Sequence, residues 1–298
     1  MSADDLNTKA APAGNLVVDY LGQAPPGTTP ERFAPGIISM AGAIHGSIAF
    51  NRDASEIYWT LQPSDFLENP PRIMCVRKTD RGWTEPAAVP ICDENGAGEI
   101  SISPSGDRLF FSSRRPLPRD WGYQPQRGSR EWGVGKIWYA DREGGNWGKP
   151  HILEKEINQG LEGVSATNEG TLYSSGIRRI KKTADGWGSI ERLGPPLEIT
   201  KPGGQFKGGH PYVAPDESFI IFNDDWPGHK GYGIFVSFRD STDSWSRPMN
   251  IFAEMGIERG GSVPVLSPDG KYLFYFMGEG IWWVDAKIIK ELKRNYLK

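Results

Sequence analysis

Five ionisable side chains of this 298-residue chain stand beside apolar runs and are candidates for acid–base chemistry: Glu99, Glu162, His210, Asp224 and Asp225. A carboxylate near a low-dielectric surface has a shifted pKa and can exchange a proton near neutral pH. Two such groups facing a sugar could serve as general acid and as base or nucleophile. In a lyase, His210 or a carboxylate would remove a proton while Arg114 or Arg115 stabilised the anion.

A second group of side chains is typical of ligand contacts in the neighbouring loops. These predicted ligand-binding residues are His45, Arg114, Arg115, Trp121, Trp132, Trp226, Gln205 and Lys207. Indole rings offer flat apolar faces on which a sugar can stack, while charged groups bond its hydroxyls. The pattern indicates a small polar or sugar-like ligand. In the alternative interpretation, the aromatic residues form a small core within their own loops.

Each candidate also has a structural interpretation that the residues alone leave open. Glu99 and Glu162, taken here as equivalent positions of adjacent repeats, could simply pair with Arg114 or Arg115. His210 precedes a proline and could be a hydrogen-bonded core histidine. The Asp224-Asp225 pair could cap a loop.

Several chemistries lose their usual support from this sequence. The chain contains no Gly-x-Ser-x-Gly, His-Glu-x-x-His or P-loop motif, and its four histidines lack metal-ligand spacing. We therefore predict no metal site and no cofactor, while a hard cation such as calcium at the carboxylates stays an alternative. The net charge is −3 without a basic stripe, so we expect no nucleic-acid partner.

The scaffold that positions these residues is indicated by a repeated turn between apolar runs. Its five copies are Phe50–Trp59, Ile102–Phe111, Ser165–Ser174, Val213–Phe222 and Leu266–Tyr275. In Ser-Pro-Asp-Gly, proline presets one φ, aspartate bonds its own backbone and glycine takes the positive φ. A hairpin of two strands, A and B, is therefore expected at each copy. Spacing near fifty residues suits a four-stranded propeller blade.

A second turn ending in tryptophan follows four of the hairpins and predicts strands C and D. The tryptophans are Trp83, Trp147, Trp187 and Trp245, interpreted as structural rings that cover the outer hairpins. The fifth copy lacks strand D, and the segment from Arg32 to Ser39 has the matching pattern. We therefore predict an all-β, five-bladed propeller closed by an N-terminal strand, which removes exposed sheet edges. Six blades are the alternative.

The repeats resemble the PD40 family, the WD40-like repeats also found in the propeller of TolB. The resemblance covers roughly residues 32–286 and rests on the three proline-containing turns and the Trp-x-x-Pro turns. It implies a β-propeller. It implies little about function, because members range from translocation proteins to peptidase-associated propellers and lyase-like enzymes.

Strand order predicts which face of the ring carries function. The A–B turns lie at one end, so the start of strand A and the end of strand B meet at the other, with the D–A and B–C loops. The two long loops, 114–135 and 201–209, fall on this second face. Long loops on one side of a repeat array usually mark its binding face. A non-catalytic propeller that binds a protein or peptide is the alternative function.

The remaining expectations concern the ends of the chain and its surroundings. Residues 1–31 are predicted to be an extended arm, 32–286 the propeller, and 287–298 a short basic helix that packs on the ring. No apolar stretch is long enough to cross a membrane, and no apolar leader is recognisable. We expect a cytoplasmic monomer without membrane contact, or a periplasmic or secreted protein if a leader has been removed. Cys75 and Cys92 are expected to be free thiols.

Overall fold

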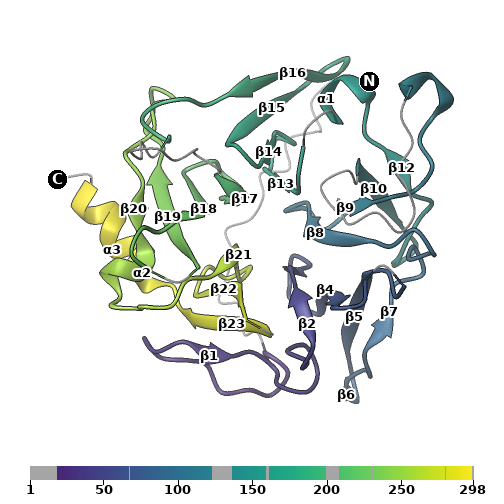
Figure 1. The fold of residues 1–298 in the computed structure, drawn as a ribbon, viewed down its shortest axis with the longest axis horizontal. Helices are drawn as coiled ribbons and strands as arrows, with labels where there is room; N and C mark the ends of the chain where they lie inside the picture. Colours follow the sequence, from purple (N-terminus) through teal and green to yellow (C-terminus); the bar gives the residue numbers. More distant parts are fainter. Residues whose placement is uncertain are drawn as a thin grey trace, which may run out of the picture.

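The computed structural model describes residues 19–66, 68–122, 136–158, 161–198, 208–229, 231–278 and 280–296, and for 43–45 the backbone alone. Five small antiparallel sheets follow one another around a ring (Figure 1). The five-bladed propeller expected from the repeats is therefore confirmed. The six-bladed alternative is not supported, because the five sheets account for every strand of the described residues.

Blades 1 and 2 follow the order expected for strands A to D. Blade 1 contains β2 (Ala43–His45), β3 (Ile48–Phe50), β4 (Glu56–Pro63), β5 (Arg72–Thr79), β6 (Gly82–Trp83) and β7 (Ala87–Ala88). Blade 2 contains β8 (Gly98–Ile102), β9 (Arg108–Ser113), β10 (Lys136–Glu143), β11 (Asn146–Trp147) and β12 (His151–Ile152). A short 3-10 turn, η1 (Arg119–Trp121), and α1 (Lys155–Asn158) lie outside the strands.

Blades 3 to 5 have the same strand order, and each consists of four strands that are not divided into shorter pieces. Blade 3 contains β13 (Val164–Ala166), β14 (Leu172–Ser174), β15 (Arg178–Thr183) and β16 (Gly186–Arg192). Blade 4 contains β17 (Gly209–Val213), β18 (Phe219–Asp225), β19 (Tyr232–Phe238) and β20 (Met249–Asn250), followed by α2 (Ile251–Glu254). Blade 5 contains β21 (Ser262–Leu266), β22 (Tyr272–Met277), β23 (Gly280–Asp285) and the N-terminal β1 (Glu31–Arg32).

The A–B turns have the geometry that their residues predict. In blade 5 the Ser267 hydroxyl donates to the Asp269 carboxylate at 2.6 Å, and Gly270 has a φ of 66°. The turns of blades 1 and 4 keep the same backbone without glycine, since Ala54 and Glu217 have φ values of 53° and 58°. A non-glycine residue in this region is strained by about 1–2 kcal/mol. The hairpin is therefore maintained by the strands around it as well as by the turn.

The ring closes through an N-terminal strand, as predicted, but the strand lies slightly earlier than the expected segment. Glu31 and Arg32 pair with Trp283 and Trp282 of β23. The residues from Phe33 to Ser39 instead form a turn, in which the buried Ser39 hydroxyl donates to the Ile281 carbonyl at 2.9 Å and accepts from the Ile281 amide at 3.0 Å. The two ends of the propeller are thus joined within one sheet.

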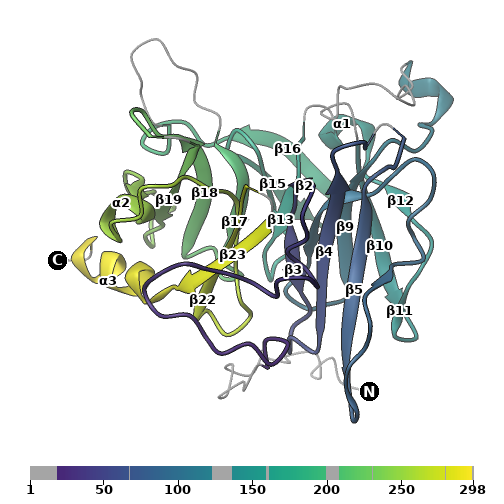
Figure 2. The same cartoon turned by 60° about the horizontal axis from the view of Figure 1, so that its bottom comes forward.

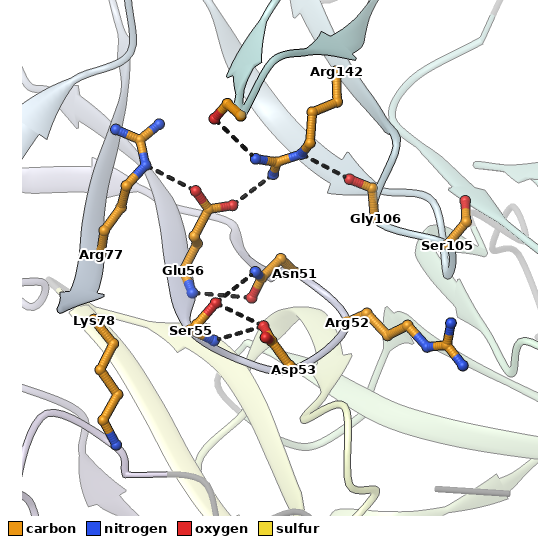
Figure 3. Close-up of a pocket in the computed structure, with 11 residues that line it drawn as sticks. Asn51, Arg52, Asp53, Ser55, Glu56, Arg77, Lys78, Ser105, Gly106 and Arg142 are labelled. Atoms are coloured by element: carbon orange, nitrogen blue, oxygen red, sulfur yellow. Dashed lines mark hydrogen bonds and ion pairs between the residues drawn. The ribbon is translucent and has the colours of Figure 1, made fainter. Parts of the chain in front are cut away.

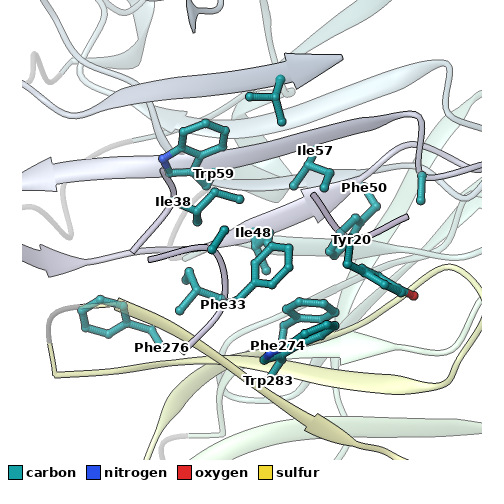
Figure 4. Packing of buried hydrophobic residues seen from close by; sticks show 14 residues of the cluster. Tyr20, Phe33, Ile38, Ile48, Phe50, Ile57, Trp59, Phe274, Phe276 and Trp283 are labelled. Carbon is teal, nitrogen blue, oxygen red and sulfur yellow. The ribbon is translucent and has the colours of Figure 1, made fainter. Parts of the chain in front are cut away.

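An aromatic cluster fills the junction between blades 5 and 1. The rings of Tyr20 and Phe33 pack on Phe274 and Trp283, with centroid separations of 5.0–6.5 Å (Figure 4). Tyr20 belongs to the predicted arm, so at least this part of the arm contributes to the core. At the other end, α3 (Lys287–Tyr296) lies beside α2 (Figure 2), and its buried residues Ile289 and Leu292 join the core of blades 4 and 5.

The tryptophans of the second turns take part in packing between blades, consistent with their structural interpretation. Trp147 of blade 2 is buried and its indole nitrogen donates to the Tyr58 hydroxyl of blade 1 at 3.2 Å. Trp245 of blade 4 packs edge-on against Tyr173 of blade 3. Cys75 and Cys92 are both free, as expected. No helix among the described residues is long and apolar enough to cross a membrane.

We predict that Phe33→Ala destabilises the fold by about 3–5 kcal/mol, because it empties a fully buried site at the ring closure. Ile37→Ala in the same turn is the matched control, since Ile37 is 39% exposed and its truncation should cost no more than about 0.5 kcal/mol. Urea unfolding measures both free energies. Equal losses for the two variants would contradict the role given to the closure.

We also predict acid lability at the contact between blades 3 and 4. The Arg179 guanidinium donates to Asp243 at 2.7 Å, and Arg239 donates to the same carboxylate at 2.6 Å. The Arg179 hydrogen bond, opposed by partial burial and assisted by Arg239, lowers the pKa of Asp243 from 3.8 to about 2. A lowered pKa contributes stability above the unfolded value, so this contribution is lost as the pH falls from about 4 to about 2. Unfolding free energies over this range should fall less steeply for Asp243→Asn than for the parent.

Candidate functional site

The candidate site begins with one equivalent position in every blade, near the start of strand A. Counting back from the A–B turns gives the five residues of this ring: Ser47, Glu99, Gly163, His210 and Val263. Strand pairing shifts register across this position in blades 2, 4 and 5. Such bulges re-aim a side chain and are common beside functional sites.

The backbone at this ring is left-handed in four blades. The φ values are 50° at Glu99, 56° at Gly163, 43° at His210 and 54° at Val263. Only glycine adopts this region freely, so Glu99 and His210 hold a strained conformation that blade 3 achieves with glycine. The strain is sustained because the surrounding sheet fixes both residues.

The five strands A line a central cavity of about 830 Å³. Glu99 and His210 line it near one end, and the A–B turns, with Asp53, Asp216 and Asp269, line the other. Between these ends the walls are largely apolar, formed by side chains such as Val265. The cavity is large enough for a drug-sized or sugar-sized ligand.

Glu99 and His210 meet across this cavity although they come from blades 2 and 4. The His210 Nε2 atom lies 3.5 Å from Glu99 Oε1, and the Ser112 hydroxyl donates to Glu99 Oε2 at 2.8 Å. Their side chains are 23% and 15% exposed, so they are largely but not fully withdrawn from water. The pair therefore combines a proton donor and a proton acceptor at the edge of a concave site.

The surroundings of His210 favour its charged form. Burial pushes the pKa of His210 down, but the hydrogen bond that the imidazole donates to Glu99 and the charges of Glu99 and Glu162 act in the opposite direction. A side-chain hydrogen bond with Asn223 adds to the second effect, and the pKa of His210 is raised overall from its ordinary value of 6.5. The raised pKa widens the pH range over which His210 is an imidazolium beside Glu99.

Side chains of neighbouring blades hold this region in place. The Ser47 hydroxyl of blade 1 accepts from the Ile100 amide of blade 2 at 3.0 Å. In the same way Ser175 of blade 3 accepts from the His210 amide at 3.1 Å, and the Asn223 side chain of blade 4 accepts from the Val263 amide at 3.1 Å. These bonds use amide groups beside the bulges, so they stabilise the strained backbone directly.

Glu162 is not equivalent to Glu99, and the expectation that they occupy matching positions was wrong. Strand pairing places Gly163 at the position of Glu99, so Glu162 is one residue earlier. The Glu162 side chain is exposed, and its backbone carbonyl accepts from the Ser174 and Ser175 hydroxyls. A one-residue offset reverses the direction of a strand side chain, which explains why Glu162 lies at the rim.

Asp224 and Asp225 do not line the cavity. The Asp224 carboxylate is fully buried and accepts from the Asp225 amide at 2.6 Å and from the Gly208 amide at 3.4 Å. These bonds correspond to the loop-capping interpretation of Asp224.

Arg115 does not line the central cavity and is engaged elsewhere. It forms an ion pair with Asp93 at 3.0 Å, donates to the Ile91 carbonyl, and lies over the rings of Phe111 and Trp138. Arg114 is buried and, like Arg115, is absent from the cavity wall. The alternative in which a glutamate pairs with Arg115 is not observed among the described residues, because Arg115 pairs with Asp93.

The aromatic candidates that can be placed pack against the protein. Trp121 packs on the core between blades 1 and 2. Trp226 stacks on His229 with 3.8 Å between the ring centroids, and it also contacts the ring of Phe252. These contacts agree with the alternative in which such rings build a local core. His45 lies in β2, where only its backbone is placed. Three predicted ligand contacts lie outside the described residues: Trp132, Gln205 and Lys207.

Within the described part of the chain, no group of three histidine, cysteine or acidic side chains is arranged to hold a metal ion. The three aspartates at the turn end of the cavity already accept hydrogen bonds from protein groups. For example, Asp216 accepts from the Ser218 amide, and Asp269 bonds Tyr20 and Ser267. The calcium alternative therefore gains no geometric support from these residues.

The sequence places Ser175 and Asn223 on this face, at the ends of strands B, but it does not predict the supporting contacts of Ser112, Ser175 and Asn223 or the role of Gly163. Ser112 bonds Glu99 across the bulged strand pair of blade 2. Ser175 and Asn223 instead accept from backbone amides of the following blade, so their contacts exist only between neighbouring blades. A faint signal exists, because a glycine precedes both Glu99 and His210 in the sequence.

Comparison with known proteins gives a distant structural likeness. No family model and no curated protein matches the chain. A putative TolB from Agrobacterium tumefaciens has 17% identity and a TM-score of 0.46, with 78% of this chain covering 69% of that one. TolB from Acinetobacter baumannii has 17% identity and a TM-score of 0.43, and the match covers 80% of this chain and 51% of that one. A gluconolactonase from Xanthomonas campestris has 11% identity and a TM-score of 0.45, and the match covers 83% of this chain and 87% of that one.

The chain is thus distantly similar to TolB propeller domains and to other β-propellers. Identities this low concern the fold alone, and membership of the PD40 family stays a prediction. The function must be argued from the site itself.

We predict that the Glu99–His210 pair makes stability depend on pH near neutrality. Because the folded pKa of His210 is raised above 6.5, its contribution is fully present below about pH 6.5 and is lost as the pH rises through the folded pKa. Glu99→Gln should flatten this part of the profile. Urea unfolding from about pH 6 to pH 9, with NMR titration of the His210 imidazole, measures it. A titration of His210 at or below 6.5 would rule the pairing out.

Proposed function

We propose that this propeller binds a small polar, sugar-like ligand at the Glu99–His210 end of its central cavity and transfers protons to and from it as a hydrolase or lyase. The observation that carries the proposal is the dyad itself. Two groups from blades 2 and 4 converge at 3.5 Å on the wall of an 830 Å³ cavity. A cavity with a few convergent polar groups and a perturbed pKa is the usual form of such a site.

Val263 of blade 5 shares the left-handed backbone of Glu99 and His210, so what sets blades 2 and 4 apart is the ionisable side chain carried at this strained position. Glycine would satisfy the left-handed positions without cost, as it does at Gly163 in blade 3. Glutamate and histidine there cost about 1–2 kcal/mol each. Residues kept in strained conformations cluster at active sites and ligand clamps.

The charge state of the dyad suggests its chemistry. His210 in its imidazolium form would donate to a leaving or carbonyl oxygen of the ligand, and Glu99 would accept a proton from a hydroxyl or from an acidic carbon. Glu162 would add negative charge at the rim, where it favours the imidazolium. Each cycle then returns the dyad to its starting state once the two protons have exchanged with water.

The placement of the other carboxylates favours this acid–base pair over a two-carboxylate glycosidase. Of the four predicted catalytic carboxylates, only Glu99 lines the cavity. A glycosidase needs two carboxyl groups on either side of one bond. The dyad of unlike groups is therefore the better candidate.

The test is a thermal-shift screen of neutral and acidic sugars and small metabolites, followed by turnover assays on every compound that binds. A ligand at a hundredfold excess over its Kd stabilises the folded state by about 2.7 kcal/mol, enough for a clear rise in Tm. We expect Glu99→Gln and His210→Gln to lose this rise and any turnover.

Asp216→Asn is the matched control, because Asp216 lines the same cavity at its opposite end. It should keep both the shift and the turnover. Full binding and turnover in both dyad variants would reject the proposed site, and binding with no turnover on any compound would reduce the proposal to a binding protein.

A further inference from the structure

A second cavity, of about 400 Å³, opens between blades 1 and 2 on the face that carries the A–B turns (Figure 3). Its wall includes the blade 1 turn from Asn51 to Glu56, the end of β5 with Arg77 and Lys78, and Arg142 from β10. The cavity lies at the opposite end of the blades from Glu99 and His210, and none of the predicted site residues lines it.

The charge of this cavity is positive on a chain whose net charge is −3. Four basic side chains line it, Arg52, Arg77, Lys78 and Arg142, against the two carboxylates of Asp53 and Glu56. Asp53 is engaged within its own turn, where it accepts from the amide and hydroxyl of Ser55 at 3.1 and 2.7 Å. Two positive charges therefore remain in excess.

Glu56 fixes two of the arginines. Its largely buried carboxylate accepts from Arg77 Nε at 2.8 Å and from Arg142 Nη2 at 2.5 Å, while the Tyr58 hydroxyl donates to it at 3.0 Å. Although burial opposes ionisation, these bonds lower the pKa of Glu56, so it stays charged. The guanidinium groups are thus oriented before any ligand arrives.

Several donors at this cavity are still available to a ligand. Among the described residues, Arg52 has no hydrogen-bond or ion-pair partner, and Arg77 uses only its Nε atom. Lys78 lies 3.5 Å from Asp19, but both side chains are more than 40% exposed, so water and salt screen this pair. The free donors belong to long side chains at the opening of the cavity.

A related cluster in the same molecule has no such excess. Between blades 3 and 4, Tyr173 donates to Glu217 as Tyr58 does to Glu56. There, however, Arg179 and Arg239 are shared among three carboxylates, those of Glu217, Asp243 and Glu191. Between blades 3 and 4, two arginines are therefore paired with three carboxylates. Between blades 1 and 2, the two arginines Arg77 and Arg142 are paired with one carboxylate, that of Glu56. The same tyrosine–glutamate–arginine arrangement thus forms without excess positive charge, so the excess between blades 1 and 2 is not needed to hold two blades together.

We propose that the cavity between blades 1 and 2 binds a phosphate group, either as a free polyphosphate anion or as a phosphate ester. Arginine presents planar donor pairs that match phosphate oxygens, and lysine adds a mobile point charge. The central cavity shares Asn51, Arg52 and Asp53 with this site, but its turn end adds the carboxylates of Asp216 and Asp269 and lacks Arg77, Lys78 and Arg142, so it suits an anion less well. This site is independent of the Glu99–His210 dyad.

The experiment uses the full chain and measures binding of pyrophosphate and of phenyl phosphate by calorimetry and by phosphorus NMR. Arg52→Gln combined with Lys78→Gln should weaken binding at least about tenfold, which corresponds to about 1.4 kcal/mol. Both side chains are exposed and make no bond to Glu56, so the fold should be unchanged. Lys181→Gln combined with Arg192→Gln, two exposed basic residues of blade 3, is the charge-matched control and should bind as the parent does.

Tighter binding of pyrophosphate supports a free anion as the source, and tighter binding of phenyl phosphate supports an ester. Absence of binding to both probes at about 10 mM would overturn the proposal, since even a millimolar Kd would be detected there. Equal binding by the parent and the double variant would overturn it as well. Glu99→Gln should leave phosphate binding unaltered, which separates this test from that of the dyad.

Discussion

The propeller depends on one short antiparallel pairing, in which Glu31 and Arg32 align with Trp283 and Trp282. Without it, β23 would present an open edge with unsatisfied backbone groups. The pairing is short, but the Ser39 hydroxyl extends it by bonding both backbone groups of Ile281. The aromatic cluster around Phe33 then gives the closure the hydrophobic energy that two residues of strand could not supply.

Ring closure determines what the starts of the strands A can do. Five equivalent positions face one cavity, so residues more than a hundred positions apart in sequence can share a site, as Glu99 and His210 do. The bulge at this position re-aims the side chain at the cost of a left-handed backbone. Bonds from Ser175 and Asn223 to amides of the following blade support this backbone. The same repeated geometry therefore serves structure in some blades and presents ionisable groups in others.

Charge is distributed unevenly over this regular frame. The cluster between blades 3 and 4 is rich in carboxylates, and the cluster between blades 1 and 2 is rich in arginine and lysine. Both are built around a tyrosine that donates to a glutamate. Blades that are alike in backbone thus differ in electrostatic potential, because the frame fixes positions and leaves the residue at each surface position free to vary.

The sequence by itself determined the blade number, the antiparallel order and the face on which Glu99 and His210 lie. These follow from turn chemistry, which acts over four or five residues. Counting from the turns already puts Glu162 one position off the ring, whereas only the tertiary structure decided that Arg115 pairs with Asp93 and that Glu56 binds two arginines. A bulge reverses the direction of a side chain without changing the turn pattern, and the partners of Glu56 lie 21 and 86 residues away. Contacts at such separations exist only once the blades have closed into a ring.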